Sequence, residues 1–390
     1  MRASPLLLFP VGEYEARQRR LIAAMERNGL DALILTSDEN TFYFSGFRSI
    51  VWDSKVSTPG TVVITKDGSM ALATSQGGAP TACVTSCAED IRVYGKNGYP
   101  TYIKAITSLL EDRGVKKGRI GFELGMGHKM YLNYSMTREL FAELQSAEIA
   151  DAANVLWEVR SVKSPLEVEA IAKACEINVS CIHKGFSELR EGMTEMELYG
   201  NIMGEYFKNG ADNTLPLGLR AGADRYSQSN CPPSYRPIMR GDIILVDGGP
   251  IYHGYYSDII REAVIGEPTA RQQEIFDVAR EACYVGLEAV KPGEPISGVC
   301  RAVDDFFDRS KFAEINMYRN WCGHSIGVGV HEYPMLDTEA DRLLEPGMVF
   351  AIEPYIFEEG SGSLGIEQNF VVTETGCRIL SQGYDELIRL

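Results

Sequence analysis

Carboxylates set inside apolar, strand-like segments are the feature that most constrains how this chain can fold. Asp247 ends one such segment and Asp258 begins the next, while Glu353 and Glu367 stand in two later ones. An ionised carboxylate is costly to bury unless a cation or hydrogen bonds compensate its charge. The fold must therefore bring these strands together around positive charge, and a pair of divalent cations supplies it.

A glycine-rich stretch, Cys322–Pro334, adds two of the five histidines in the chain. Its glycines permit close approach of the backbone, so both imidazoles can reach one site. We expect His324 to be a nitrogen ligand and His331 to donate a hydrogen bond to a substrate carbonyl or oxyanion. Four carboxylates with one imidazole suit two divalent ions, with Mn²⁺ as the expected metal and Co²⁺ or Zn²⁺ as alternatives. Two such ions that share a water can run hydrolysis.

The composition argues against several classes of partner. The formal net charge is −16, which repels a phosphate backbone and argues against nucleic acid. The apolar runs are too short to span a bilayer, and Leu6–Pro10 is too short for a signal peptide, so no membrane partner is expected. Nine cysteines without CxxC spacing are typical of reduced thiols, which indicates a cytoplasmic protein.

Two domains are expected, because 390 residues exceed what one ordinary core accommodates. Strands and helices alternate through residues 1–160, which predicts a small α/β domain. Ser164, Pro165 and Glu167 then form the start signal of a helix with a capping box. Helices followed by antiparallel strand pairs make up residues 161–390, and this order predicts an α+β second domain.

Taken together, these segments resemble the pita-bread metallohydrolases, a family that includes methionine aminopeptidase, aminopeptidase P, prolidase and creatinase. Glu13–Phe47 is similar to the opening of the two-domain creatinase/prolidase branch. Val159–Ile171 is similar to the segment that leads into the catalytic domain of that branch. The resemblance implies an α+β pita-bread catalytic domain over residues 161–390, preceded by a smaller α/β creatinase-type domain over residues 1–160.

The resemblance also implies roles for individual residues. Asp247 would bind one ion, Asp258 and Glu367 would bridge the two ions, and His324 with Glu353 would complete the other site. Glu353 would also be the general base, and His331 would steady the tetrahedral intermediate. The family's five metal ligands thus fall, in chain order, on Asp247, Asp258, His324, Glu353 and Glu367.

A homodimer is a further implication of the resemblance, because this branch commonly pairs subunits. The aromatic-rich segment Thr41–Lys55 is our candidate for shaping the pocket of the partner subunit. The alternative is that this segment belongs to the core of the N-terminal domain.

Two positions depart from the pattern of the family's peptidases. The substrate-contacting histidine, about eleven residues before Gly241-Asp242, is replaced by Asn230. Asn230 can donate a hydrogen bond to a substrate but cannot carry a proton. The arginine of the proline-specific members, two positions before the last glutamate, is replaced by Gly365. Three other arginines could restore the lost positive charge: Arg220, Arg225 and Arg236.

Three functions are compatible with this sequence. The leading prediction is a dinuclear metal-dependent hydrolase that cleaves a peptide or amide bond, most simply an Xaa-Pro dipeptidase or an enzyme like aminopeptidase P. An alternative is a creatinase-like C–N hydrolase or lyase that acts on a small nitrogen- or sulfur-containing metabolite, and the altered positions 230 and 365 favour it. A non-catalytic binding protein is the third, and the complete set of metal ligands argues against it.

Overall fold

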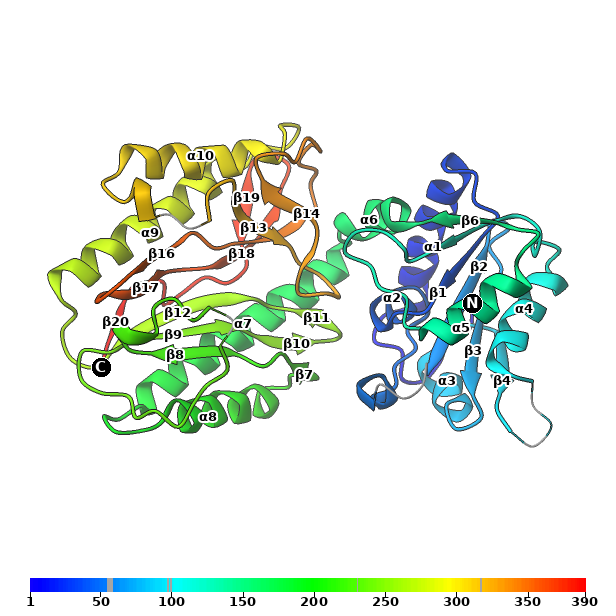
Figure 1. Ribbon diagram of the computed structural model, residues 1–390, viewed down its shortest axis with the longest axis horizontal. Helices are drawn as coiled ribbons and strands as arrows, with labels where there is room; N and C mark the ends of the chain where they lie inside the picture. Colours follow the sequence, from blue (N-terminus) through cyan, green and yellow to red (C-terminus); the bar gives the residue numbers. More distant parts are fainter. Residues whose placement is uncertain (55–58, 97, 99, 230, 316–317) are drawn as a thin grey trace. The chain divides into compact units, whose positions relative to one another are not determined.

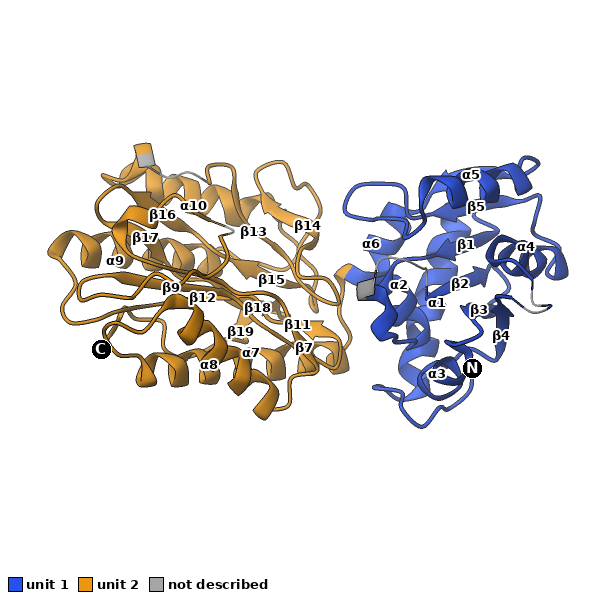
Figure 2. Cartoon of the chain, turned by 60° about the horizontal axis from the view of Figure 1, so that its bottom comes forward, with its two compact units in different colours: residues 1–160 blue, residues 161–390 orange. Residues whose placement is uncertain are grey.

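The computed structural model covers residues 1–390 and describes all of them except residues 55–58, 97, 99, 230 and 316–317 (Figure 1). The chain divides into two compact units, Met1–Arg160 and Ser161–Leu390 (Figure 2). Among the described helices, none has the length and apolar character needed to cross a membrane.

Unit 1 is built on a six-stranded mixed sheet with the order β4-β3-β2-β1-β5-β6. The central strand β1 pairs antiparallel with β2 and parallel with β5. The strands are β1 (Ala32–Leu35), β2 (Gly60–Thr65), β3 (Met70–Ser75), β4 (Asp90–Tyr94), β5 (Arg119–Phe122) and β6 (Glu148–Asp151). The helices are α1 (Val11–Arg27), α2 (Asp38–Ser45), α3 (Ala79–Thr85), α4 (Tyr102–Asp112), α5 (Tyr134–Glu143) and α6 (Ala153–Ser161), which crosses into unit 2. This arrangement is the expected α/β domain.

The aromatic segment after β1 does not lie at the surface. Tyr43, Phe44 and Phe47 are each about 1% exposed or less, so α2 packs into the core of unit 1. The prediction that these rings line an interface is therefore wrong, and the core alternative holds for them. Burying a large aromatic side chain is among the strongest single contributions to a core. Within the same segment Ile50 is 92% exposed, and Lys55 lies outside the described residues.

Unit 2 begins with two long helices, α7 (Pro165–Glu188) and α8 (Glu195–Lys208), each started by a capping box. They cover a four-stranded sheet with the order β20-β12-β9-β8. Its strands are β8 (Gly218–Ala221), β9 (Ile243–Gly248), β12 (Ile259–Val264) and β20 (Ile388–Arg389). A small sheet, β11-β10-β7, extends from it and contains β7 (Asn213–Thr214), β10 (Pro250–Tyr252) and β11 (Tyr255–Tyr256).

The two faces of the four-stranded sheet differ in chemistry. Leu219, Val246 and Ala263 belong to the apolar cluster that packs against α7 and α8. Successive side chains of a strand alternate between faces, so the neighbours of these residues point the other way. We call this second side the inner face; it carries Arg220, Leu245, Asp247, Ile260 and Glu262.

The second half of unit 2 repeats this arrangement. A five-stranded sheet, β14-β13-β15-β18-β19, is covered by α9 (Ala270–Glu288) and α10 (Ser297–Arg309) through an apolar cluster that includes Phe350 and Phe370. The strands are β13 (Trp321–Ser325), β14 (Glu332–Asp337), β15 (Val349–Ile352), β18 (Gln368–Val372) and β19 (Cys377–Ile379). A hairpin of β16 (Tyr355–Glu358) and β17 (Gly362–Gly365) completes the unit. In both views the strands lie between α7 and α8 on one side and α9 and α10 on the other (Figures 1 and 2).

The hairpin that begins with β9 extends beyond the four-stranded sheet. Gly248, Gly249 and Pro250 do not form its turn, because β10 and β11 continue the hairpin beyond them. The chain reverses at His253 and Gly254, both with positive φ. Gly249 is needed for another reason: a Cβ there would lie 2.2 Å from the side-chain amide of Asn178. The glycines mark the point where the strands leave one sheet for the next.

Candidate metal centre

The five predicted ligands converge at one place within unit 2. The described residues contain three groups of candidate ligand atoms. Within each group the atoms lie within 4.8 Å of one another. Glu367 belongs to two of them, one with Asp247 and Asp258 and one with His324 and Glu353. The third group joins Asp258 and His324 to His331. We call the five residues Asp247, Asp258, His324, Glu353 and Glu367 the ligand cluster.

The first sheet contributes the two aspartates through its strand register. Asp247 on β9 faces Ile260 on β12, and Asp258 comes directly before β12. Because residues two apart on a strand share a face, both carboxylates point to the inner side. The side chain of Asn369 fixes the backbone of Asp258: Oδ1 accepts its N–H at 3.0 Å and Nδ2 donates to its carbonyl at 2.6 Å.

The imidazole of His324 is oriented by its own chain. Nδ1 lies 3.0 Å from the carbonyl oxygen of Ser325, which can only accept, so the proton sits on Nδ1. This leaves the lone pair of Nε2 free for a metal ion. Nε2 lies 3.4 Å from Oε1 of Glu353, 3.8 Å from Oδ2 of Asp258 and 4.0 Å from Oε1 of Glu367.

The two glutamates come from the second sheet. Glu353 follows β15, and its N–H donates to the carbonyl of Cys322 at 2.9 Å. Glu367 precedes β18, and its carbonyl accepts a hydrogen bond from the guanidinium of Arg261 at 2.8 Å. Arg261 is itself buried, and it ties β12 to the segment that holds Glu367. The backbone of each glutamate is therefore fixed while its carboxylate is directed into the cluster.

Burial changes the acidity of the whole cluster. Desolvation, followed by the charge of Glu353, raises the pKa of Asp247 to about 7. Desolvation likewise raises the pKa of Glu353 to about 7 and those of Asp258 and Glu367 well above their ordinary values. Burial lowers the pKa of His324 to about 4, so this ring is neutral near pH 7. Without added positive charge the carboxylates would retain protons that cations can replace.

The donor set fits divalent metal ions. Nε2 of His324 and both carboxylate oxygens of Glu367 are buried and have no hydrogen-bond partner among the described residues. Buried polar atoms are normally hydrogen-bonded, and three such atoms in one cluster favour a bound cation. Oxygen donors with a single imidazole match the preferences of hard and borderline ions such as Mn²⁺.

His331 lies at the rim of the cluster. Its ring centroid is 4.2 Å from that of His324, and its side chain is exposed. Partial desolvation by the surrounding protein, with the neighbouring His324 as the second cause, lowers the pKa of His331. The next residue, Glu332, is buried and pairs with Lys163 at 3.2 Å. The Lys163–Glu332 ion pair therefore fixes one end of the loop that connects the two histidines.

The two departures from the family pattern have different outcomes. Asn230 lies outside the described residues. Gly365 lies at the end of β17, where a Cβ would be 2.4 Å from Cβ of Tyr355 and 2.8 Å from the carbonyl oxygen of Pro354. This backbone position has no room for any side chain, so an arginine could not simply be restored there.

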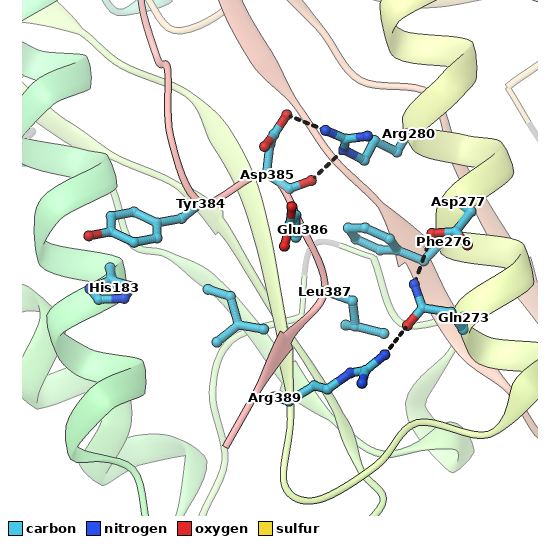
Figure 3. A pocket seen from close by; sticks show the side chains of 11 residues that line it. His183, Gln273, Phe276, Asp277, Arg280, Tyr384, Asp385, Glu386, Leu387 and Arg389 are labelled. Carbon is cyan, nitrogen blue, oxygen red and sulfur yellow. Dashed lines mark hydrogen bonds and ion pairs between the residues drawn. The ribbon is translucent and has the colours of Figure 1, made fainter.

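A pocket of about 780 Å³ lies elsewhere on unit 2 (Figure 3). It is lined by His183, by one side of α9 and by the C-terminal segment. Several of its polar groups bond to one another: Arg280 pairs with Asp385 at 3.1 Å, and Gln273 donates to Asp277 at 2.8 Å. It contains none of the predicted site residues, so the chemistry of the ligand cluster is separate from it.

Two supporting residues were missed in the sequence. Asn369 stands two positions after Glu367 in an apolar strand, and Arg261 stands between Ile260 and Glu262 in another. Each is a polar residue in a segment that reads as buried, which is the same signal that marks the ligands. Their roles depend on partners more than 100 positions away, and the local sequence does not identify those partners.

Comparison with known proteins agrees with this architecture. The model of metallopeptidase family M24 matches residues 169–374, and that of the creatinase/prolidase N-terminal domain matches residues 17–162. The chain is 28% identical over 356 residues to an uncharacterised peptidase of Staphylococcus saprophyticus, covering 91% of this chain and 96% of that protein. It is 26% identical over 375 residues to an Xaa-Pro dipeptidase of Pyrococcus horikoshii, covering 95% of this chain and 98% of that protein.

A solved structure extends the likeness to three dimensions. An Xaa-Pro dipeptidase from Bacillus anthracis superposes with a TM-score of 0.85 at 25% identity, covering 97% of this chain and all of that one. The pita-bread fold with a creatinase-type N-terminal domain, expected from the sequence, is thereby confirmed. Because the M24 model alone spans more than half of its residues, this chain belongs to metallopeptidase family M24, in the creatinase/prolidase branch, and is a hydrolase of the peptidase type.

Proposed function

We propose that this protein is a dinuclear metal-dependent hydrolase that cleaves the bond before proline, as an Xaa-Pro dipeptidase or an enzyme like aminopeptidase P. The observation that carries the proposal is the position of Glu367, which belongs to two ligand groups and has both carboxylate oxygens unpartnered among the described residues. One carboxylate shared by two groups is the arrangement that two neighbouring ions require. The Pyrococcus and Bacillus relatives are Xaa-Pro dipeptidases, which supports the choice of substrate.

The roles of the residues follow from their positions. Asp247 would hold one ion, His324 with Glu353 the other, and Asp258 and Glu367 both. Two ions bound there would activate a water and polarise the scissile carbonyl. Glu353 would accept the proton of the attacking water and return it to the leaving nitrogen. His331, exposed at the rim, would donate a hydrogen bond to the oxyanion that develops on the substrate.

Several finer points belong to the same proposal. Mn²⁺ is the expected metal, with Co²⁺ and Zn²⁺ as alternatives, because four of the five ligands are carboxylates. Residues 161–390 would be the catalytic domain and residues 1–160 the creatinase-type domain. A homodimer in the cytoplasm is proposed as well, and nine free cysteines support a reducing compartment.

A second candidate function keeps the ligand cluster and changes the substrate. A creatinase-like C–N hydrolase or lyase would act on a small nitrogen- or sulfur-containing metabolite. The observation in its favour is Gly365, because the arginine of the proline-specific pocket is missing and cannot be accommodated at that position.

Metal analysis combined with dipeptide hydrolysis tests the proposal. Elemental analysis of the purified protein should give about two equivalents of metal per chain after Mn²⁺ loading. Mn²⁺-dependent turnover of glycyl-proline, without turnover of glycyl-leucine, is the expected result. Bound metal with no turnover of either dipeptide would favour the small-metabolite function. Failure to bind any divalent ion would overturn both.

A further inference from the structure

Three arginines near the first sheet are candidates to supply the charge missing at position 365. Their ion-pair and hydrogen-bond partners in the structure distinguish them. Arg225 pairs with the buried Glu195 and also donates to Ser234 at 2.8 Å. Arg236 pairs with Asp242 at 2.6 Å. Arg220 is 4% exposed, and its Nε and Nη1 groups have no hydrogen-bond partner among the described residues. Of these three, and within the part of the chain that the structure describes, Arg220 is the arginine with guanidinium nitrogens left for a ligand.

The strand register places Arg220 beside the ligand cluster. On β8 and β9, Gly218 faces Asp247 and Arg220 faces Leu245. Arg220 is therefore on the inner face. Its partner on β9, Leu245, lies two residues from Asp247. Two residues along a strand span about 7 Å, and one residue of an extended peptide spans about 3.5 Å. Along the strand direction, a substrate group one residue beyond a bond held at the cluster would therefore lie between the position of Asp247 and that of Arg220.

The region around Arg220 is the one that Gly365 borders. Leu245 also faces Glu262 on β12, and the carboxylate of Glu262 accepts the N–H of Gly365 at 3.2 Å. Tyr355 and Phe357 of the β16–β17 hairpin pack against Leu245. Arg220 therefore lies on one side of Leu245, and Glu262 with its partner Gly365 lies on the other side. Tyr355 and Phe357 cover this part of the inner face. The charge that position 365 cannot carry is available there from β8.

A buried guanidinium without a partner is costly, and a carboxylate is the group that satisfies it best, through two parallel hydrogen bonds. We propose that Arg220 binds the C-terminal carboxylate of the substrate, so that this protein acts on dipeptides in preference to longer peptides. The inference rests on the proposed function for the position of the scissile bond. A longer peptide would present a neutral peptide group where the carboxylate is needed and would leave the guanidinium unpaired.

A different role for Arg220 would be to balance the negative charge of Asp247 and Glu262 without touching the substrate. That role affects metal binding and stability equally for all substrates. Carboxylate recognition instead makes turnover depend on the charge at the C-terminus. Paired substrates that differ only in this charge therefore separate the two roles.

The experiment compares glycyl-proline with glycyl-prolinamide on the Mn²⁺-loaded, full-length protein. The unsubstituted protein should prefer the free acid, with a KM for glycyl-proline at least about 30-fold lower than that for glycyl-prolinamide. This factor corresponds to about 2 kcal/mol for a buried charge pair that the amide cannot form. Arg220→Gln should abolish this preference by raising KM for the acid, and Arg220→Lys should keep part of it. Arg378→Gln, which removes an exposed arginine on β19, should leave the preference unchanged. An Arg220→Gln variant with an undiminished preference would overturn the inference.

Equilibrium binding makes the test independent of turnover. L-proline and L-prolinamide are titrated into the Mn²⁺-loaded protein by calorimetry. If the protein binds L-proline selectively and Arg220→Gln removes this selectivity, the inference is supported even when no dipeptide is cleaved. Absence of dipeptide cleavage would overturn the proposed function but not the role of Arg220. Equal affinity for both compounds, or no binding of L-proline by the unsubstituted protein, would overturn the role of Arg220.

Discussion

Lys163 and Glu332 form an ion pair inside unit 2, with 3.2 Å between Nζ and Oε2 and each side chain 1% exposed. Lys163 also donates to Oγ of Ser325 at 3.0 Å, and Oε1 of Glu332 accepts the N–H of Gly329 at 3.0 Å. The pair thus holds both ends of the loop between His324 and His331. A Cβ at Gly327 would lie 2.6 Å from the Glu332 carboxylate, so the loop closes tightly around it.

Removing both members of this pair should cost less than the sum of the losses from removing each one alone. Lys163→Met leaves the Glu332 carboxylate buried without its cation, and we expect the free energy of unfolding to fall by about 3–5 kcal/mol. The double variant Lys163→Met/Glu332→Gln should lose less than the sum of the single variants. Urea unfolding measures all of these values. Lys173→Met, which breaks an exposed pair with Glu176, is the control and should cost less than about 1 kcal/mol. Additive losses would show that the two side chains do not act together.

Asn369 should support metal binding without being a ligand. Asn369→Leu keeps the branched shape of the side chain but removes both hydrogen bonds to the backbone of Asp258. Affinity for Mn²⁺ should fall by about 10–100-fold, because supporting residues orient the ligands they contact. Titration calorimetry of the metal-stripped protein measures this change. An Asn369→Leu variant that unfolds more easily but binds Mn²⁺ normally would show that its role is only structural.

The sequence could point to the five residues of the ligand cluster, which lie together in the structure, because its signal is chemical as well as local. Each carboxylate is conspicuous in an apolar segment, and the antiparallel strands bring Asp247 and Asp258 together by register alone. The α/β and α+β characters of the two units also followed from the order of their elements. Burying charge on a strand is so unfavourable that carboxylates which break the apolar pattern stand out in the sequence.

Other parts of the structure could not be read from the sequence. The core position of Tyr43 and Phe44 depends on how α2 packs, and an aromatic run looks alike in a core and at an interface. That Nε and Nη1 of Arg220 have no partner among the described residues emerges only from tertiary contacts, because Arg225 and Arg236 look equivalent to Arg220 in the sequence. The absence of space at Gly365 likewise results from the β16–β17 pairing with Tyr355.

Restoring the family arginine at position 365 should destabilise the protein. Gly365→Arg places a Cβ 2.8 Å from the carbonyl oxygen of Pro354, so backbone must move to admit it. We expect a loss of about 1–3 kcal/mol in the free energy of unfolding, measured with urea. Gly360→Arg is the control, since a Cβ there has open space, although its positive φ adds some strain. A Gly365→Arg variant as stable as the parent would contradict the packing described for β17.

Replacing the proposed general base should lower turnover more than it changes substrate affinity. Glu353→Gln removes a carboxylate that lies 3.4 Å from Nε2 of His324, and kcat should fall by about 10²–10⁴-fold. Glu358→Gln, on β16, loses a pair with the surface residue Arg271 and serves as the control with near-normal kcat. Steady-state kinetics with glycyl-proline separates kcat from KM. Equal losses in the two variants would remove Glu353 from the mechanism.

Metal removal should give the protein an unusual dependence of stability on pH. Asp247 and Glu353 have folded pKa values of about 7 because they are desolvated, against about 4 in an unfolded chain. The folded, metal-free protein therefore binds more protons than the unfolded chain between these values, so its stability falls as pH rises from about 4 through about 7. Bound Mn²⁺ replaces those protons, so the metal-loaded protein should not lose stability in this way. The Tm difference between loaded and stripped protein, measured by thermal unfolding, should therefore widen from pH 5 to pH 8. Carboxylates elsewhere in the chain titrate alike in both forms and cancel in that difference. A gap that stays constant with pH would mean that the buried carboxylates do not exchange protons for metal.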